Sequence, residues 1–129
     1  MYLTLADLVK DAKSRIREIT VEELHEAIEN NREHILVDIR EPDEHKIWRI
    51  SGSILSPRGI LEACVDLNNP NRNKALADAR GEKVVLYCAT GGRSALAADV
   101  LQKMGFTDVE SLAGGITHWR DSGYHIEQN

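Results

Sequence analysis

Two apolar, β-branched runs constrain the fold of this 129-residue chain more than any other feature. Residues 34–39 read His-Ile-Leu-Val-Asp-Ile, and residues 83–88 read Lys-Val-Val-Leu-Tyr-Cys. Near-continuous apolar runs of this length are typical of strands that are buried on both faces of a parallel sheet. Parallel strands need crossover connections, which are usually helices. The two runs therefore predict an α/β fold.

The segments around these runs supply the other elements. Apolar residues at helical spacing predict helices over residues 4–16, 20–30, 94–104 and 116–122, with shorter ones over 42–46, 59–67 and 74–79. Thr4 with Asp7, and Thr20 with Glu23, have the spacing of helix-capping pairs. Further short strands are expected at Ile19, 53–56 and 107–112. Strands that alternate with helices predict a mainly parallel sheet with right-handed crossovers.

Length, charge and hydropathy exclude several classes of protein. A chain of 129 residues suits one compact domain. The net charge of −5, with no cluster of lysines and arginines, argues against nucleic acid as a partner. No apolar run approaches the roughly 18 residues of a membrane span, and the first residues lack the features of a secretion signal. We therefore expect a cytoplasmic protein without a membrane partner.

The cysteines and histidines give no sign of a metal centre. Cys64 and Cys88 are the only cysteines, which is too few for a disulfide scaffold or for paired Cys-x-x-Cys zinc ligands. The five histidines show no His-x-x-x-His spacing. No metal and no cofactor are therefore expected, and each cysteine is expected to be either buried or reactive.

The most informative motif is the segment Cys88-Ala89-Thr90-Gly91-Gly92-Arg93-Ser94, which joins a buried strand to a helix. Backbone N–H groups converge at such a junction, and the helix dipole there is positive. Glycine lets the backbone approach a ligand closely, so that successive N–H groups surround one centre. These groups would stabilise a thiolate at Cys88, and Arg93 would hold an incoming oxyanion.

Two other interpretations of Cys88 are open to test. A lone cysteine at a strand end is more often a small buried hydrophobe, but the glycine pair and Arg93 favour chemistry. Cysteine phosphatases also use such a cradle, with five residues between the cysteine and the arginine. Only four residues intervene here, which makes a tighter ring that favours a single terminal sulfur atom. No aspartate is identifiable as the general acid that ester cleavage also needs.

Four landmarks together resemble a single-domain rhodanese over residues 19–124. They are Val37-Asp38-Ile39-Arg40-Glu41, Ser51-Gly52-Ser53-Ile54 followed by Pro57, the loop Cys88 to Ser94, and Leu112-Ala113-Gly114-Gly115-Ile116-Thr117-His118-Trp119. The resemblance implies a rhodanese-like α/β fold with a five-stranded, mainly parallel sheet flanked by helices on both faces. Residues 1–18 would then form an N-terminal helical extension, and residues 19–129 the rhodanese-like domain.

The resemblance also implies an enzyme, a thiosulfate or persulfide sulfurtransferase. Cys88 would take sulfane sulfur from a donor such as thiosulfate or a low-molecular-weight persulfide and pass it, as a persulfide, to a thiol, cyanide or a protein acceptor. Ala89, Thr90, Gly91, Gly92, Arg93 and Ser94 would bind the substrate, together with Arg58. A monomer or homodimer is expected. The alternatives are a non-catalytic persulfide carrier or protein-docking module and, less favoured, a cysteine phosphatase.

Two departures from the family pattern carry expectations of their own. Trp48-Arg49-Ile50-Ser51 stands where many members have Gly-His-Ile, so the packing of that segment is expected to differ. Arg93 is the only cation in the loop, which predicts weak turnover of thiosulfate or a persulfidic donor. Asp38 and Arg40 are interpreted as a structural ion pair, and Trp119 and Gly114-Gly115 as packing and turn residues. Cys64 is interpreted as a buried helix residue, with a resolving-thiol role left open.

Overall fold

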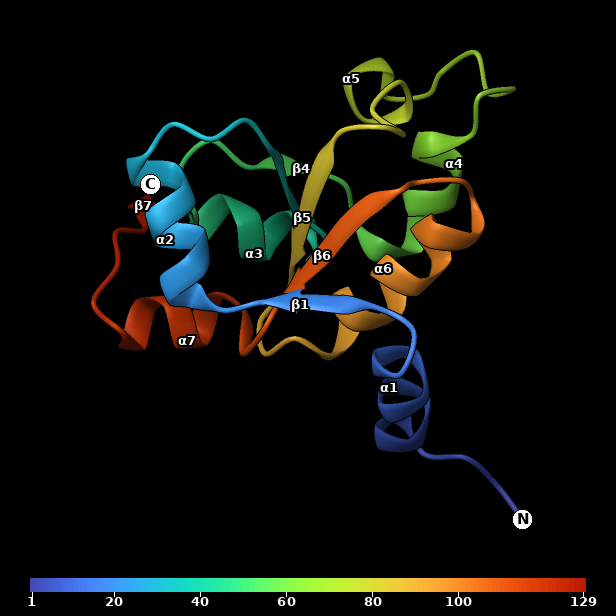
Figure 1. Ribbon diagram of the computed structural model, residues 1–129, viewed down its shortest axis with the longest axis horizontal. Helices are drawn as coiled ribbons and strands as arrows, with labels where there is room; N and C mark the ends of the chain where they lie inside the picture. The colour runs from blue at the N-terminus through green and yellow to red at the C-terminus, as the bar shows by residue number, and fades with distance from the viewer.

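A five-stranded parallel sheet forms the centre of the computed structural model, which describes residues 1–129 (Figure 1). The strands lie in the order β1-β6-β5-β2-β4, and every neighbouring pair is parallel. Their bounds are β1 (Arg17–Ile19), β2 (Ile35–Asp38), β4 (Ile54–Leu55), β5 (Lys83–Tyr87) and β6 (Asp108–Leu112). The predicted α/β class and the number of strands in this sheet are confirmed.

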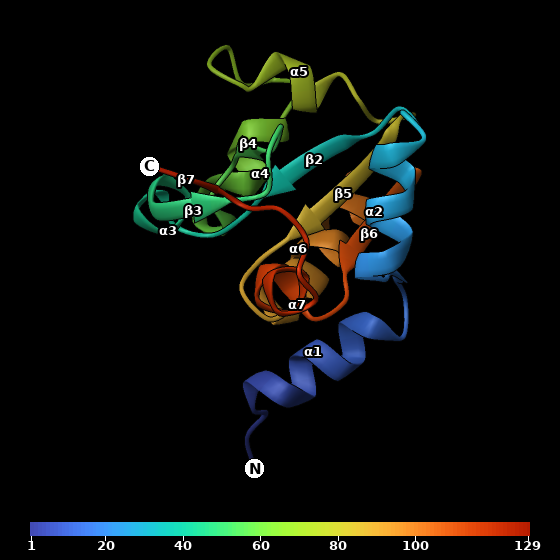
Figure 2. The same ribbon diagram turned by 90° about the vertical axis from the view of Figure 1, so that its left-hand side faces the viewer.

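Helices cover both faces of the sheet, which explains why β2 and β5 are apolar on both sides (Figures 1 and 2). One core cluster joins Val37 and Leu86 to α4 (Leu61–Val65), α5 (Lys74–Ala77) and α6 (Gly92–Lys103). The other joins Leu36 and Val85 to α2 (Val21–Glu29) and α7 (Gly115–Asp121). Successive strand residues thus enter opposite cores. Full burial of such a side chain stabilises the fold by about 1.5–3 kcal/mol.

The first helix, α1 (Leu5–Lys13), packs along α6 rather than on the sheet (Figure 2). Both predicted capping pairs form, because Thr4 with Asp7 and Thr20 with Glu23 exchange backbone and side-chain hydrogen bonds at the starts of α1 and α2. The sheet begins at Arg17, after a short connection from the end of α1 at Lys13. The division of the chain at residues 18 and 19 stays a prediction.

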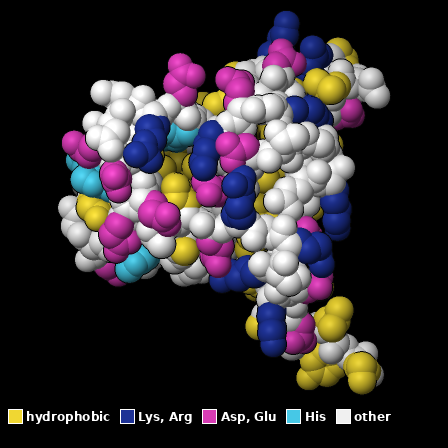
Figure 3. Space-filling model, viewed as in Figure 1, with side chains coloured by type: hydrophobic (Ala, Val, Ile, Leu, Met, Phe, Trp, Pro, Cys, Tyr) yellow, Lys and Arg dark blue, Asp and Glu magenta, His cyan; other side chains and the backbone are white.

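The contact between α1 and α6 combines one buried side chain with an ion pair. Ala12 is buried, and Arg15 donates two hydrogen bonds to Asp99 at 2.9 and 2.8 Å. Hydrophobic side chains gather at the opposite, exposed end of this segment, where the N-terminus lies (Figure 3). They are Met1, Tyr2, Leu3, Leu5 and Leu8. No helix of the molecule combines the length and the apolar character needed to cross a bilayer.

Several boundaries differ from the sequence prediction. The helix after Cys88 begins at Gly92 instead of Ser94, because Gly91 takes a left-handed conformation (φ +102°) and starts the helix. The helix expected over 59–67 is a 3-10 turn, η1 (Arg58–Ile60), followed by α4. A separate antiparallel ribbon of β3 (Trp48–Arg49) and β7 (Glu127–Gln128) was not predicted, since two-residue strands carry no periodicity. The remaining helix is α3 (Pro42–Ile47).

Candidate active site

Cys88 lies directly after β5, at the carboxyl edge of the sheet, and is 1% exposed. Its Sγ atom accepts hydrogen bonds from the backbone N–H groups of Gly91 at 3.1 Å and Ser94 at 3.4 Å. Gly91 contributes its N–H because its positive φ turns the chain back over the sulfur. Two N–H groups and the positive end of α6 thus face one sulfur atom, an arrangement that stabilises a thiolate.

A pair of buried hydroxyl groups lies behind the sulfur. The Cys88 thiol donates to Ser94 Oγ at 3.5 Å, and Ser94 Oγ lies 2.8 Å from Ser111 Oγ of β6. Both serines are fully buried. The sequence predicted Ser94 as a site residue but not Ser111. A serine at a buried position near the carboxyl end of a strand is a usable signal for such a residue, because a buried hydroxyl needs a hydrogen-bond partner.

The start of α7 supports the other side of the loop. The N–H groups of Ile116 and Thr117 donate to the carbonyl oxygens of Cys88 and Ala89 at 2.9 and 3.1 Å. Gly115 adopts φ +64°, and a Cβ at this position would lie only 2.6 Å from the Cys88 carbonyl oxygen. Gly115 is therefore more than a turn residue, because its missing side chain lets α7 approach the loop.

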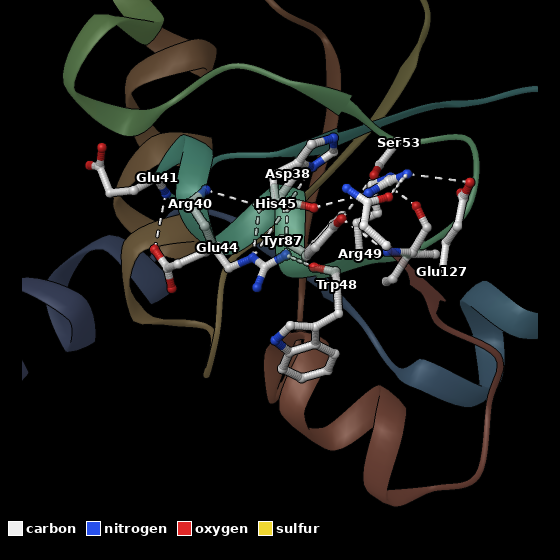
Figure 4. Close-up of polar contacts among 12 residues, drawn as sticks. Asp38, Arg40, Glu41, Glu44, His45, Trp48, Arg49, Ser53, Tyr87 and Glu127 are labelled. Atoms are coloured by element: carbon white, nitrogen blue, oxygen red, sulfur yellow. Dashed lines mark hydrogen bonds and ion pairs between the residues drawn. The ribbon is translucent and has the colours of Figure 1, made fainter.

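Arg93 extends from the first turn of α6 and forms an ion pair with Glu44 of α3. Its Nη1 and Nη2 atoms donate to Oε1 and Oε2 of Glu44 at 3.1 and 3.3 Å. The hydrogen bonds from Arg93 lower the pKa of Glu44, and the same contact raises the pKa of Arg93. Oε1 of Glu44 also accepts the Glu41 backbone N–H at 3.0 Å, as Figure 4 shows. Sequence reasoning missed Glu44, whose signal was an acidic first turn after Pro42.

Beneath α3 lies the ion pair that the sequence predicted. The Asp38 carboxylate accepts hydrogen bonds from the guanidinium of Arg40 at 2.8–3.2 Å and from His45 Nδ1 at 2.9 Å (Figure 4). Arg40 also donates to the Trp48 carbonyl oxygen at 2.6 Å. Asp38 and Arg40 are 0% and 1% exposed. Nearby, burial raises the pKa of Tyr87 to about 12, so its hydroxyl stays protonated and hydrogen-bonds Ser53 at 2.8 Å.

The remaining candidate residues make fewer contacts with the Cys88 sulfur and its loop. Thr90 is exposed, and Gly92 lies close to the Val9 side chain of α1. Arg58, in η1, donates to Glu62 at 3.0 Å, and no hydrogen bond or ion pair joins it to the Cys88 loop. Cys64 lies partly buried in α4 as a free thiol. Substrate contacts of Thr90 and Arg58 stay predictions.

The buried Cys88 in its backbone cradle, at the carboxyl edge of a parallel sheet, defines a class of α/β domain with a cysteine loop between a strand and a helix. Comparison of the sequence with protein families shows which family of such domains the chain belongs to. The model of the rhodanese-like domain matches residues 20–122, and the chain belongs to this family. The membership of the rhodanese family predicted from the four sequence landmarks is thereby confirmed.

Individual relatives agree with this assignment. The Mycobacterium tuberculosis protein named "Probable adenylyltransferase/sulfurtransferase MoeZ" is 36% identical over 102 residues, which is 78% of this chain and 24% of that protein. A Schizosaccharomyces pombe protein named "Putative thiosulfate sulfurtransferase, mitochondrial" is 33% identical over 90 residues, 67% of this chain and 63% of its own length. The chain thus spans about a quarter of the first relative and under two thirds of the second.

A solved structure resembles nearly the whole chain, including α1. It is that of a Rhodopseudomonas palustris protein of unknown function, described as a possible tyrosine phosphatase. The two chains are 33% identical with a TM-score of 0.90, and the match covers 98% of this chain and 96% of the other. The N-terminal helix is therefore a feature that a second protein shares.

Proposed function

We propose that the protein is a sulfurtransferase that carries sulfane sulfur as a persulfide on Cys88. The donation of two backbone N–H groups to Sγ, within a loop of four residues between Cys88 and Arg93, is the observation that carries this proposal. The names of two relatives include sulfurtransferase, which supports sulfur transfer as the general chemistry. We propose the sulfur donor as a chemical class, thiosulfate or a low-molecular-weight persulfide, and the sulfur acceptor as a thiol or cyanide.

The reaction would proceed in two displacements at sulfur. The Cys88 thiolate attacks the terminal sulfur of the donor, a new S–S bond forms, and the old one breaks to release sulfite from thiosulfate or a thiolate from an organic persulfide. An acceptor thiolate or cyanide then attacks the outer sulfur and regenerates the Cys88 thiolate. The N–H groups of Gly92 and Arg93 begin a helix and have no intrahelical acceptor, so they can bind the outer sulfur.

Mass measurement tests the first displacement. Wild-type protein incubated with thiosulfate or glutathione persulfide should gain one sulfur atom on Cys88, and Cys88→Ser should gain none at that position. Cys64→Ser is the matched control, since it removes the other free thiol and should still be loaded. No adduct on Cys88 with any donor would contradict the proposal.

Turnover distinguishes an enzyme from a non-catalytic carrier or docking module. A catalytic protein should release thiocyanate from cyanide over many cycles, whereas a carrier should load once and wait for a specific protein acceptor. Thiocyanate formed in an amount no greater than that of the protein would favour the carrier. Cellular function that survives Cys88→Ser would favour a docking role.

A phosphatase is the second candidate, because the structurally similar Rhodopseudomonas palustris protein is described as a possible tyrosine phosphatase. Four residues between Cys88 and Arg93 make a smaller ring than phosphatases use, so we expect no hydrolysis of an aryl phosphate. Release of the aryl alcohol by wild type, and not by Cys88→Ser, would overturn this expectation.

A further inference from the structure

Three arginines considered for the site, Arg40, Arg58 and Arg93, are each held by a carboxylate. Arg40 is paired with Asp38 inside the protein, and Arg58 is paired with Glu62. Arg93, the one cation of the loop itself, is paired with Glu44 through both of its terminal nitrogens. An anionic donor that approaches Cys88 therefore meets a guanidinium whose charge is already balanced.

Glu44 is fixed in this position by a second hydrogen bond. Its Oε1 atom accepts the Glu41 backbone N–H at the start of α3, which is the reciprocal bond of a capping box. The segment that precedes Glu41 is itself anchored, because Asp38 accepts the Arg40 backbone N–H and forms the buried ion pair with the Arg40 side chain. A carboxylate held by the backbone pays little entropy to bind Arg93, so it competes well with a mobile anion.

The pair of Glu44 and Arg93 is nonetheless accessible to small solutes. Their side chains are 36% and 38% exposed. Arg93 directly precedes Ser94, whose backbone N–H donates to Cys88 Sγ at 3.4 Å, so Arg93 leaves the chain beside the sulfur. The carboxylate of Glu44 consequently acts on any charged group that reaches the sulfur past Arg93.

We propose that Glu44 determines donor specificity: it disfavours dianionic sulfane donors and favours donors of lower negative charge. This inference rests on the proposed sulfur transfer through Cys88. Glu44 acts in two ways, because its charge repels the donor and its hydrogen bonds occupy the guanidinium that would bind a sulfonate. Removal of that charge should help a dianion more than a monoanion.

Thiosulfate and methanethiosulfonate form a matched pair of probes. Both donate a terminal sulfur from an S–SO₂ group, but thiosulfate carries one more negative charge. With cyanide as acceptor, Glu44→Gln should raise the ratio of kcat/KM for thiosulfate to that for methanethiosulfonate by about threefold to tenfold, the effect of one unit charge in a half-exposed site. Glutamine keeps an oxygen acceptor for the Glu41 N–H, so α3 should stay folded.

Asp108→Asn is the matched control. Asp108 is also paired with an arginine, Arg17, at 2.7 Å, and its side chain is 38% exposed. It lies at the amino end of β6, whereas Cys88 follows the carboxyl end of β5. This substitution removes one negative charge from the far edge of the sheet and should leave the donor ratio within about twofold of wild type, since salt screens distant charges.

Alkylation provides a readout that needs no sulfur transfer. Iodoacetate and iodoacetamide react with a thiolate by the same displacement of iodide, but only iodoacetate is charged. The ratio of the iodoacetate rate to the iodoacetamide rate at Cys88 should rise about threefold in Glu44→Gln and stay constant in Asp108→Asn. Mass spectrometry of the Cys88 peptide measures both rates.

The outcomes separate this inference from the proposed function. A donor ratio that is unchanged in Glu44→Gln, or that rises equally in Asp108→Asn, overturns the role of Glu44 while sulfur transfer stands. Failure of every donor to load wild-type Cys88 overturns the proposed function and donor selection together, and the alkylation ratio then reports only the charge of Glu44.

Discussion

Two arginine–carboxylate pairs contact neighbouring residues of α3, and they differ in burial. Asp38 and Arg40 are almost fully buried and share further hydrogen bonds with His45 and the Trp48 carbonyl. Glu44 and Arg93 are more than a third exposed. A buried pair cannot exchange its partners without a large desolvation cost, whereas an exposed pair can. The inner pair therefore fixes the position of α3, and the outer pair sets the charge that a substrate meets.

The largest expected effect comes from breaking the inner pair. Asp38→Asn leaves the Arg40 guanidinium buried without a counter-charge and should lower the free energy of unfolding by about 3–5 kcal/mol. Urea unfolding measures this loss, with Asp108→Asn as the control for an exposed pair. A loss below about 1 kcal/mol would mean that the inner pair is no more structural than a surface pair.

Glycines give a second comparison between the support of the loop and the periphery. Gly115 and Gly123 both have positive φ, but only Gly115 would place a Cβ against the loop. Gly123→Ala should cost about 1 kcal/mol from backbone strain, and Gly115→Ala about 1–3 kcal/mol more with a loss of Cys88 loading. Thermal unfolding and intact mass together test this. Equal effects of the two substitutions would show that contact with the loop is unimportant.

Removal of the hydroxyl of Ser111 should have a smaller effect. Ser94 keeps the Gly91 carbonyl as an acceptor, so Ser111→Ala should cost about 0.5–1.5 kcal/mol of stability. Without Ser111, the Ser94 hydroxyl loses one of the groups that hold it beside Cys88 Sγ, and alkylation of Cys88 by iodoacetamide should slow. Ser56→Ala is a suitable control, because the Ser56 hydroxyl is buried without a hydrogen-bond partner. Faster alkylation in Ser111→Ala would contradict the role assigned to this hydroxyl.

The smallest expected effect on stability is that of Glu44→Gln. At neutral pH it should change the free energy of unfolding by less than about 1 kcal/mol, because the pair is half-exposed. Arg93 lowers the pKa of Glu44 in the folded state, so the contribution is present above the pKa of an unfolded glutamate and is lost as the pH falls through the lowered value. Wild type and Glu44→Gln should therefore converge in thermal stability in acid. Divergence in acid would contradict this linkage.

The parts of the molecule that could be predicted from the sequence are those with local signals. The apolar runs that contain Val37 and Val85 predicted the sheet, and Cys88 with the following glycines and Arg93 predicted the loop. Glu44 and Ser111 could not be found in this way, because each contacts a loop residue that is distant from it in the sequence. Their partners lie 49 and 17 residues away in sequence, and only the packed fold brings them together.

The dependence of the loop on α7 has a consequence for synthesis of the chain. The N–H groups that hold the carbonyls of Cys88 and Ala89 belong to Ile116 and Thr117, and the hydroxyl that contacts Ser94 Oγ behind the sulfur belongs to Ser111. A nascent chain that has emerged from the ribosome only as far as α6 therefore carries its thiol without a completed cradle. The proposed nucleophile is fully supported only when the last helix has docked, so Cys88 of an unfinished polypeptide should react more slowly than that of the finished one.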